Sequence, residues 1–176
     1  KAKLIYTRKE MDNEWGGKTS NYFVAFVKNN TMFIFGKSIL EKLTSHKLST
    51  YQDIITHEMN HLFYKNLMKT YKPSWIFEGL ALNIQKNYNS MTKKIDRRYL
   101  YYTNRNLILL GFKKNNSKFY KEYTYKFYET SYLAVKKLLK IIEKDRLLHL
   151  LKQFSKKPTK ENYLIVFEKY VKKIFA

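Results

Sequence analysis

The feature that most constrains this chain is the pair of histidines four residues apart at residues 57–61, with a glutamate directly after the first. On an α-helix such residues lie one turn above each other on the same face, so His57 and His61 can present their imidazoles to one metal ion. Glu58 lies about 100° further round the helix and can hold a water beside that metal. The pattern H-E-x-x-H therefore predicts a helix that carries zinc, with Glu58 as general base.

A site with two histidines and a water lacks one protein ligand of tetrahedral zinc. No histidine follows soon after His61, so Glu78, seventeen residues later, is the candidate. The intervening chain is long enough for the end of one helix, a turn at Pro73 and the start of a second helix that Ser74 can cap. A carboxylate in the first turn of that helix is also favoured by the helix dipole, and this role alone is the alternative for Glu78.

Two motifs in sequence order carry a family resemblance. His-Glu-x-x-His at residues 57–61, followed by Trp-x-x-Glu-Gly-x-Ala at residues 75–81, resembles the gluzincin branch of zinc metallopeptidases. The Trp-x-x-Glu-Gly-x-Ala motif resembles the aminopeptidase-N-like clan and small bacterial peptidases of the same superfamily more closely than it resembles thermolysin. A third match, Tyr128-x-x-Ser131, is similar to a helix start in that clan where the tyrosine hydroxyl stabilises the tetrahedral intermediate.

The resemblance implies a role for each of five residues: zinc ligation by His57, His61 and Glu78, general base catalysis by Glu58, and donation to the oxyanion by Tyr128. Three other residues compete for the last role: Tyr125, Tyr132 and His149. The resemblance also implies that an edge strand before the zinc helix binds the substrate backbone by strand addition. Residues 32–36 are the candidate, with an ordinary sheet edge as the alternative.

The chain departs from the family in two places. The G-x-M-E-N motif that holds the substrate amine in aminopeptidases is absent between residues 20 and 56, which favours cleavage of internal bonds. Leu82 stands where thermolysin-like enzymes have an acid that steadies a zinc-bound histidine. A partner for that histidine is still expected, and Asn83 or a backbone carbonyl can serve.

The chain is strongly basic, with 35 Lys and Arg against 14 Asp and Glu and a net charge of +21. Such a field favours anionic partners, such as a cell-surface polymer or a membrane surface. The alternative is compositional, because Lys, Asn, Tyr, Ile and Phe are all plentiful, as in proteins from AT-rich genomes. The lysines are spread along the chain instead of gathered in one motif, so nucleic-acid binding is not the expected function.

The length of 176 residues and the 44% hydrophobic content predict one domain, residues 1–176, with a real core. The chain has no cysteine, so thiolates cannot hold zinc. That composition suits a secreted bacterial protein. There is no apolar run long enough to span a membrane. The chain begins with lysine, as expected of a processed or truncated product, and an extracellular or cell-surface location is expected.

The element pattern predicts an α+β fold with a small, mainly antiparallel sheet near the N-terminus and a helical half that holds zinc. Strands are expected at residues 3–7, 22–27 and 31–35, the last two joined as a hairpin by Asn29-Asn30. Helices are expected at six further places: 38–45, 50–71, 74–87, 98–111, 124–143 and 145–154, with a last one capped by Thr159. A polar loop at 89–97 and a charged loop at 113–121, the candidate for a flap, separate them.

The sequence therefore predicts a minimal gluzincin-like zinc metallopeptidase that acts on peptides or proteins. The alternative is a catalytically weak zinc protein that serves as a basic cell-surface or polyanion-binding module. Glu58 speaks against that alternative, because a structural zinc site needs no base. The sequence carries no signal for an oligomeric state.

Overall fold

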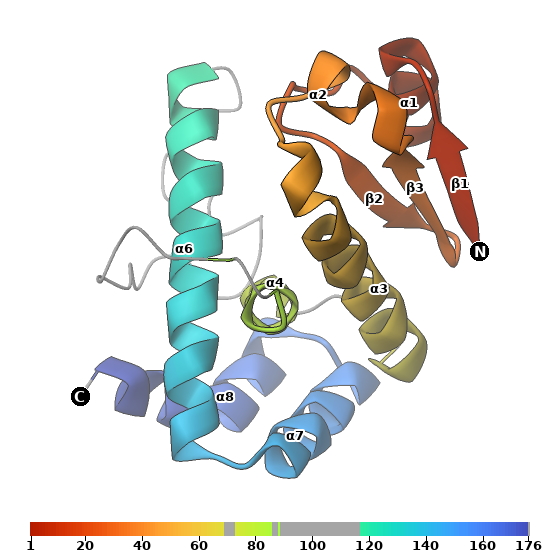
Figure 1. Ribbon diagram of the computed structural model, residues 1–176. Helices are drawn as coiled ribbons and strands as arrows, with labels where there is room; N and C mark the ends of the chain where they lie inside the picture. The colour runs from red at the N-terminus through yellow and green to blue at the C-terminus, as the bar shows by residue number, and fades with distance from the viewer. Residues whose placement is uncertain (69–72, 86–87, 89–116, 176) are drawn as a thin grey trace.

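The computed structural model describes residues 1–68, 73–85, 88 and 117–175 (Figure 1). A small sheet near the N-terminus is followed by a helical half, so the predicted α+β class is confirmed. The elements predicted at 89–97 and 98–111 lie outside the described residues.

The sheet has three strands in the order β1-β3-β2: β1 (Ala2–Ile5), β2 (Ala25–Lys28) and β3 (Thr31–Phe35). The β3 strand runs parallel to β1 and antiparallel to β2, so the sheet is mixed instead of mainly antiparallel. The predicted hairpin is present, because Asn29 and Asn30 take φ angles of 50° and 57° between β2 and β3. Positive φ at both central residues is the signature of the tight hairpin turn.

The central place of β3 corrects one expectation. Residues 32–36 were expected to form a substrate-binding edge, but Met32 to Phe35 belong to β3, which is hydrogen-bonded on both sides. The outer strand next to the helical half is β2 (Figure 1). A hairpin alone does not show which of its strands a third, distant segment will join.

A helix that the sequence analysis missed, α1 (Arg8–Trp15), follows β1. It begins at a capping box, in which the Thr7 hydroxyl accepts from the Glu10 N–H and the Glu10 carboxylate accepts from the Thr7 N–H. It ends at Gly16, whose φ of 90° suits a glycine. Trp15 is therefore the last residue of this helix.

The remaining elements are mostly helical. After β3 come η1 (Lys37–Ile39), α2 (Leu40–Leu43), η2 (Leu48–Thr50), α3 (Tyr51–Met68), α4 (Ser74–Asn83), α6 (Ser117–Ile141), α7 (Lys144–Lys156) and α8 (Lys160–Phe175). Residues 117–121, expected in a loop, belong to α6, while 113–116 are not described. In the part of the chain that is described, no helix is long and apolar enough to cross a membrane.

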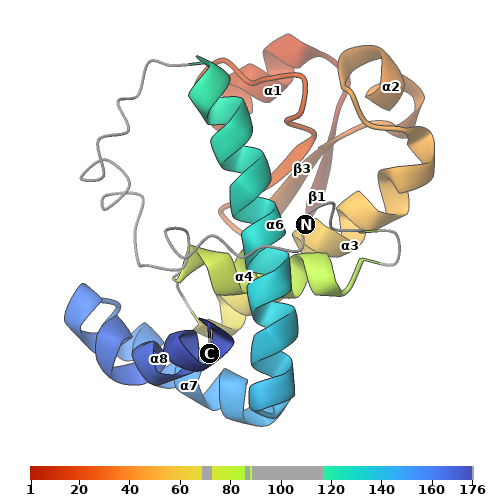
Figure 2. The ribbon, with the colours of Figure 1, turned by 90° about the vertical axis from the view of Figure 1, so that its left-hand side faces the viewer.

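Two hydrophobic cores share α3. Ile54, near its start, packs with the sheet, α1 and α2, whereas Tyr64 and Met68, near its end, pack with α4, α6, α7 and α8. Figure 1 shows α4 end-on between α3 and α6, and Figure 2 shows α6 crossing α4. The middle of α3, residues 57–61, therefore lies where the two cores meet.

Candidate metal centre

His57 and His61 lie on one face of α3, as the four-residue spacing predicts. Their Nε2 atoms are 3.0 Å apart, and the rings meet edge to face at 84°. Both side chains are largely buried. The two imidazoles thus point at one place in the interior.

Glu78 on α4 completes the group. Its Oε2 lies 3.3 Å from Nε2 of His57, and its Oε1 lies 3.4 Å from Nε2 of His61. The ligand atoms of the three residues all lie within 4.8 Å of one another, so within the described chain these side chains form a group that could hold a metal ion. His46 and His149, the other two histidines, are not members.

Two local reasons offered for Glu78 were wrong. Pro73 is the N-cap residue of α4 and no side chain caps the helix, so Ser74 is the first helical residue instead of the cap. Glu78 is the fifth residue of α4, beyond the first turn, where the helix dipole has little effect. Its position follows from how α4 packs in the fold.

Gly79 explains how α4 approaches α6 so closely. A Cβ atom at Gly79 would lie 2.2 Å from the carbonyl oxygen of Ser131 and 2.4 Å from Cγ2 of Val135. Only a glycine leaves room for that backbone contact. Tyr128 stands three residues before Ser131 on α6, so the same contact brings Tyr128 to the side of α4 that carries Glu78.

The charges of the group are set by their neighbours. Burial would raise the pKa of Glu78, but hydrogen bonds with His57 and His61 and their charges lower it to about 2. The carboxylate is therefore ionised, as a metal ligand must be. Burial raises the pKa of Glu58 above its ordinary value, with Glu78 adding to the rise and the two histidines opposing it.

Tyr128 lies in the middle of α6, not at a helix start as expected. The negative charge of Glu78, then burial, and then Glu58 and Tyr88 raise its pKa well above 10, so its hydroxyl keeps its proton. Tyr132, one turn later, packs against Tyr88 with ring centroids 4.9 Å apart.

The competing donors occupy different surroundings. The Lys136 ammonium lies 5.4 Å from the centroid of the Tyr132 ring. Tyr132 is also absent from the lining of the pocket, described below, that contains the metal group, our name for His57, His61 and Glu78. His149 is exposed on α7. The side chain of Tyr125 is not among those described.

One pocket of about 260 Å3 contains the whole group. One wall comes from the helical half and α3: His57, Glu58, His61, Ser74, Phe77, Glu78 and Tyr128. The other comes from the N-terminal half: Trp15, Phe23, Ala25, Phe26 and Val27. The sequence analysis did not identify which side chains form this second wall. The Thr7-x-x-Glu10 capping box and Gly16 were the local signals that place Trp15 at a helix end.

Asn83, one of the two partners expected for a histidine of the candidate metal site, makes its described hydrogen bonds elsewhere. Its amide nitrogen donates to the carbonyl oxygens of Gly79, at 2.7 Å, and Tyr132, at 3.0 Å. It therefore ties α4 to α6. The buried Nδ1 of His57 has no hydrogen-bond partner within the described chain.

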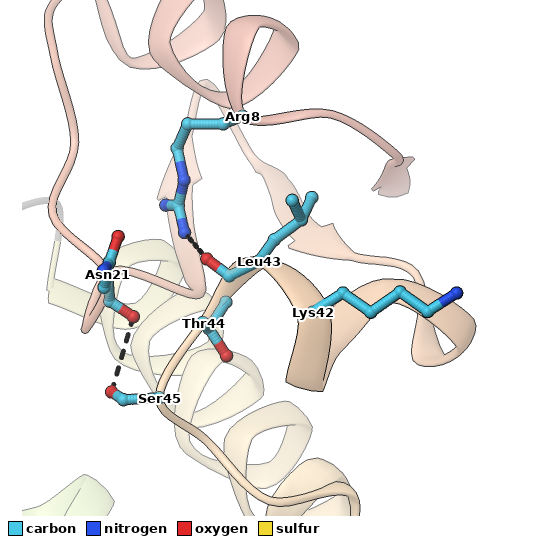
Figure 3. A pocket seen from close by; sticks show the side chains of 6 residues that line it. All are labelled: Arg8, Asn21, Lys42, Leu43, Thr44 and Ser45. Atoms are coloured by element: carbon cyan, nitrogen blue, oxygen red, sulfur yellow. Dashed lines mark hydrogen bonds between the residues drawn. The ribbon is translucent and has the colours of Figure 1, made fainter.

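A second hollow, of about 330 Å3, lies away from the metal group and is lined by Arg8, Asn21, Lys42, Leu43, Thr44 and Ser45 (Figure 3). The Arg8 guanidinium points across it and donates to the backbone carbonyls of Leu43, Ser20 and Phe23. Lys42 points away from the other lining residues. The Arg8 guanidinium thus joins α1 to residues 20–23 and to Leu43. We therefore assign this hollow a structural role.

Searches of family models, curated proteins and solved structures found no match to this chain. The function is therefore argued from the chemistry of the site.

Proposed function

We propose that the protein is a zinc-dependent metallopeptidase of the gluzincin type that cleaves internal peptide bonds. The observation that carries the proposal is the shared pocket, in which two imidazoles and a carboxylate converge beside a buried Glu58 and the Tyr128 side chain. A purely structural site needs neither of the last two groups.

The donor set suits zinc. Two imidazole nitrogens and one carboxylate oxygen are the ligands of zinc hydrolases that keep a fourth position open. Tetrahedral bonds of about 2.0–2.1 Å would separate two ligand atoms by about 3.3–3.4 Å. Here the two Nε2 atoms are 3.0 Å apart, and they lie 3.3 and 3.4 Å from the two different oxygens of Glu78, so the separations are of that order.

The residues around the metal group divide the chemistry between them. Zinc, when bound, supplies Lewis acidity that polarises a carbonyl and lowers the pKa of a water. Glu58, buried and outside the ligand set, accepts the proton of the attacking water and passes it to the leaving amine. Tyr128 donates to the developing oxyanion, and one such donor is typically worth about 10²–10³ in rate.

The outer strand β2 supports binding of an extended substrate. Ala25, Phe26 and Val27 are consecutive, and all three line the pocket. Successive side chains of a strand point to opposite faces of the sheet. A pocket on one face would therefore contact only alternate residues, whereas a pocket that contacts three consecutive residues lies along the edge of the strand. A peptide added to this edge would run past the metal group. The proposal thus assigns to β2 the role first expected of residues 32–36.

A peptide-library digest with the zinc-loaded chain, read by mass spectrometry, tests the proposal. Internal bonds should be cut, and acetylation of the substrate N-terminus should leave the rate nearly unchanged. Glu58→Ala should abolish the cleavage. Absence of any cleavage, or cleavage that persists in Glu58→Ala, would contradict it, and strict dependence on a free amine would show an exopeptidase.

The net charge of +21 favours one second candidate, a zinc protein whose main role is binding to an anionic cell-surface polymer or membrane. Attraction between exposed charges is screened by salt. Salt-sensitive binding to a polyanion, together with no cleavage of any library peptide, would favour this candidate over the peptidase.

A further inference from the structure

We propose that Trp15, Phe23 and Phe26 form an aromatic subsite that selects substrates with a large apolar side chain beside the bond that is cut. The inference rests on the proposed peptidase function and adds to it the class of side chain that the pocket accepts. Its basis is that one continuous pocket contains both the metal group and this aromatic wall.

The three rings form one cluster. The centroid of Trp15 lies 4.9 Å from that of Phe23 and 5.3 Å from that of Phe26, and the two phenylalanines are 5.6 Å apart. Their tilted and edge-to-face geometries are the favourable ones for aromatic pairs. Phe26 is 5% exposed and forms the base of the cluster, whereas Trp15 is 50% exposed. The half-exposed indole offers apolar surface that a substrate side chain can cover.

The wall is held in place without a substrate. The N–H of Gly16 donates to the carbonyl oxygen of Asp12 at 2.9 Å, which closes α1 directly after Trp15. Asp12 also accepts hydrogen bonds from the backbone and the hydroxyl of Thr19. Arg8 donates to the Phe23 carbonyl oxygen at 3.0 Å. A rigid surface loses little entropy when a ligand contacts it, so its contacts contribute more to binding.

The size and charge of the pocket favour an apolar side chain. Of the described lining residues, the acidic ones are Glu58 and Glu78, and none is lysine or arginine. An acidic or a lysine side chain of the substrate would lose hydration against the aromatic carbon of this wall without gaining a charged partner on it. The volume of about 260 Å3 is below the range of about 300–1,000 Å3 typical of pockets for drug-sized ligands. It suits one large side chain with the adjacent peptide bond.

The test uses the zinc-loaded full chain and acetylated, amidated octapeptides of Ala and Gly with one variable residue: Phe, Leu, Ala, Lys or Asp. Cleavage next to Phe and Leu should exceed cleavage of the Ala peptide by about tenfold in kcat/KM, the lower end of what burial of such a side chain contributes. Trp15→Ala and Phe23→Ala should each remove most of that preference.

Tyr22→Ala is the matched control. Tyr22 precedes Phe23, is 62% exposed and does not line the pocket. This variant should keep the wild-type preference. Circular dichroism of each variant separates a lost subsite from a lost fold.

A binding measurement keeps the inference testable if the wall variants unfold. The chain has two tryptophans, and Trp75 is 1% exposed, so a change in emission on ligand binding would come from Trp15. In the zinc-loaded Glu58→Gln protein, the Phe peptide should shift the emission and the Asp peptide should not. Trp15→Phe in the same background should abolish the shift.

The outcomes separate the two proposals. Cleavage with no preference among the peptides, or wall variants that slow every peptide equally, would overturn the subsite and leave the peptidase intact. A Phe-specific shift in emission with no cleavage of any peptide would support the subsite and overturn the peptidase. No cleavage and no shift would overturn both.

Discussion

The indole Nε1 of Trp75 donates a hydrogen bond to the hydroxyl of Tyr163 at 3.0 Å, although 88 residues separate the two in sequence. Both side chains are buried, Trp75 on α4 and Tyr163 on α8. Trp75 stands three residues before Glu78, so this bond anchors the helix that carries the third member of the metal group to the last helix of the chain. The C-terminal helices therefore help to position the site without contributing a ligand to it.

Tyr163→Phe should lower the free energy of unfolding by about 1–3 kcal/mol, because the buried indole N–H loses its acceptor. Urea unfolding measures the change. Tyr22→Phe removes a hydroxyl from an exposed tyrosine and should stay within about 0.5 kcal/mol of wild type. Equal effects of the two variants would show that the bond does not stabilise the fold.

Gly79→Ala should destabilise the protein by about 1–3 kcal/mol or more, because the new Cβ would meet the Ser131 backbone at 2.2 Å. Gly17→Ala is the control, since a Cβ there would have no neighbour within 4 Å. Thermal unfolding compares them. Equal stability of Gly79→Ala and Gly17→Ala would show that α4 does not pack so closely against α6 at Gly79.

The chain should bind one zinc ion, measured by elemental analysis after reconstitution. Glu78→Ala and His57→Ala should each lose the metal, while His149→Ala, changed at an exposed histidine of α7, should retain it. Chelation should lower the melting temperature, because a ligand at 100 times its Kd stabilises the folded state by about 2.7 kcal/mol. Full zinc content in Glu78→Ala would remove Glu78 from the ligand set.

Glu58→Gln should keep zinc and the fold while losing hydrolysis, since Glu58 lies outside the metal group. A general base typically contributes about 10²–10⁴ in rate. Initial rates on a cleaved library peptide, alongside zinc content, measure both effects. Turnover within about tenfold of wild type, against that expected range, or loss of zinc, would mean that the role belongs elsewhere.

Tyr128→Phe should lower kcat by about 10²-fold, or about 2.7 kcal/mol, with little change in KM, because the lost hydrogen bond forms only in the transition state. Tyr132→Phe, one turn later and outside the pocket, is the matched control and should keep most activity. The reverse result, an active Tyr128→Phe and a crippled Tyr132→Phe, would transfer the role to Tyr132.

Local patterns in the sequence were enough for several features. The four-residue spacing of His57 and His61 placed them on one face of α3, and Asn29-Asn30 marked the hairpin, because helix periodicity and turn geometry depend on neighbours in sequence. Thr159 was expected to cap the last helix, and its hydroxyl accepts from the Asn162 N–H. The capping box that begins α1 was equally local, and it was overlooked.

Glu78 was correctly expected beside the histidines, but for local reasons that were wrong. The structure brings it there because Gly79 lets α4 approach α6, and the packing of Trp75 among the C-terminal helices fixes where α4 lies. The motif that resembles the gluzincins predicted that Glu78 would lie near the histidines, but not the helix packing that brings it there.

The sequence by itself determined most of the helices and strands and the placement of His57 and His61 on one helix face, since each depends on residues a few positions apart. Only the tertiary structure decided that β3 is central, that Tyr128 reaches the pocket from the middle of α6, and that Trp15 and Phe23 face the metal group. These relations join segments from the sheet core and the helical core across α3. They depend on which surfaces bury each other when the chain folds, and no short-range spacing records that choice.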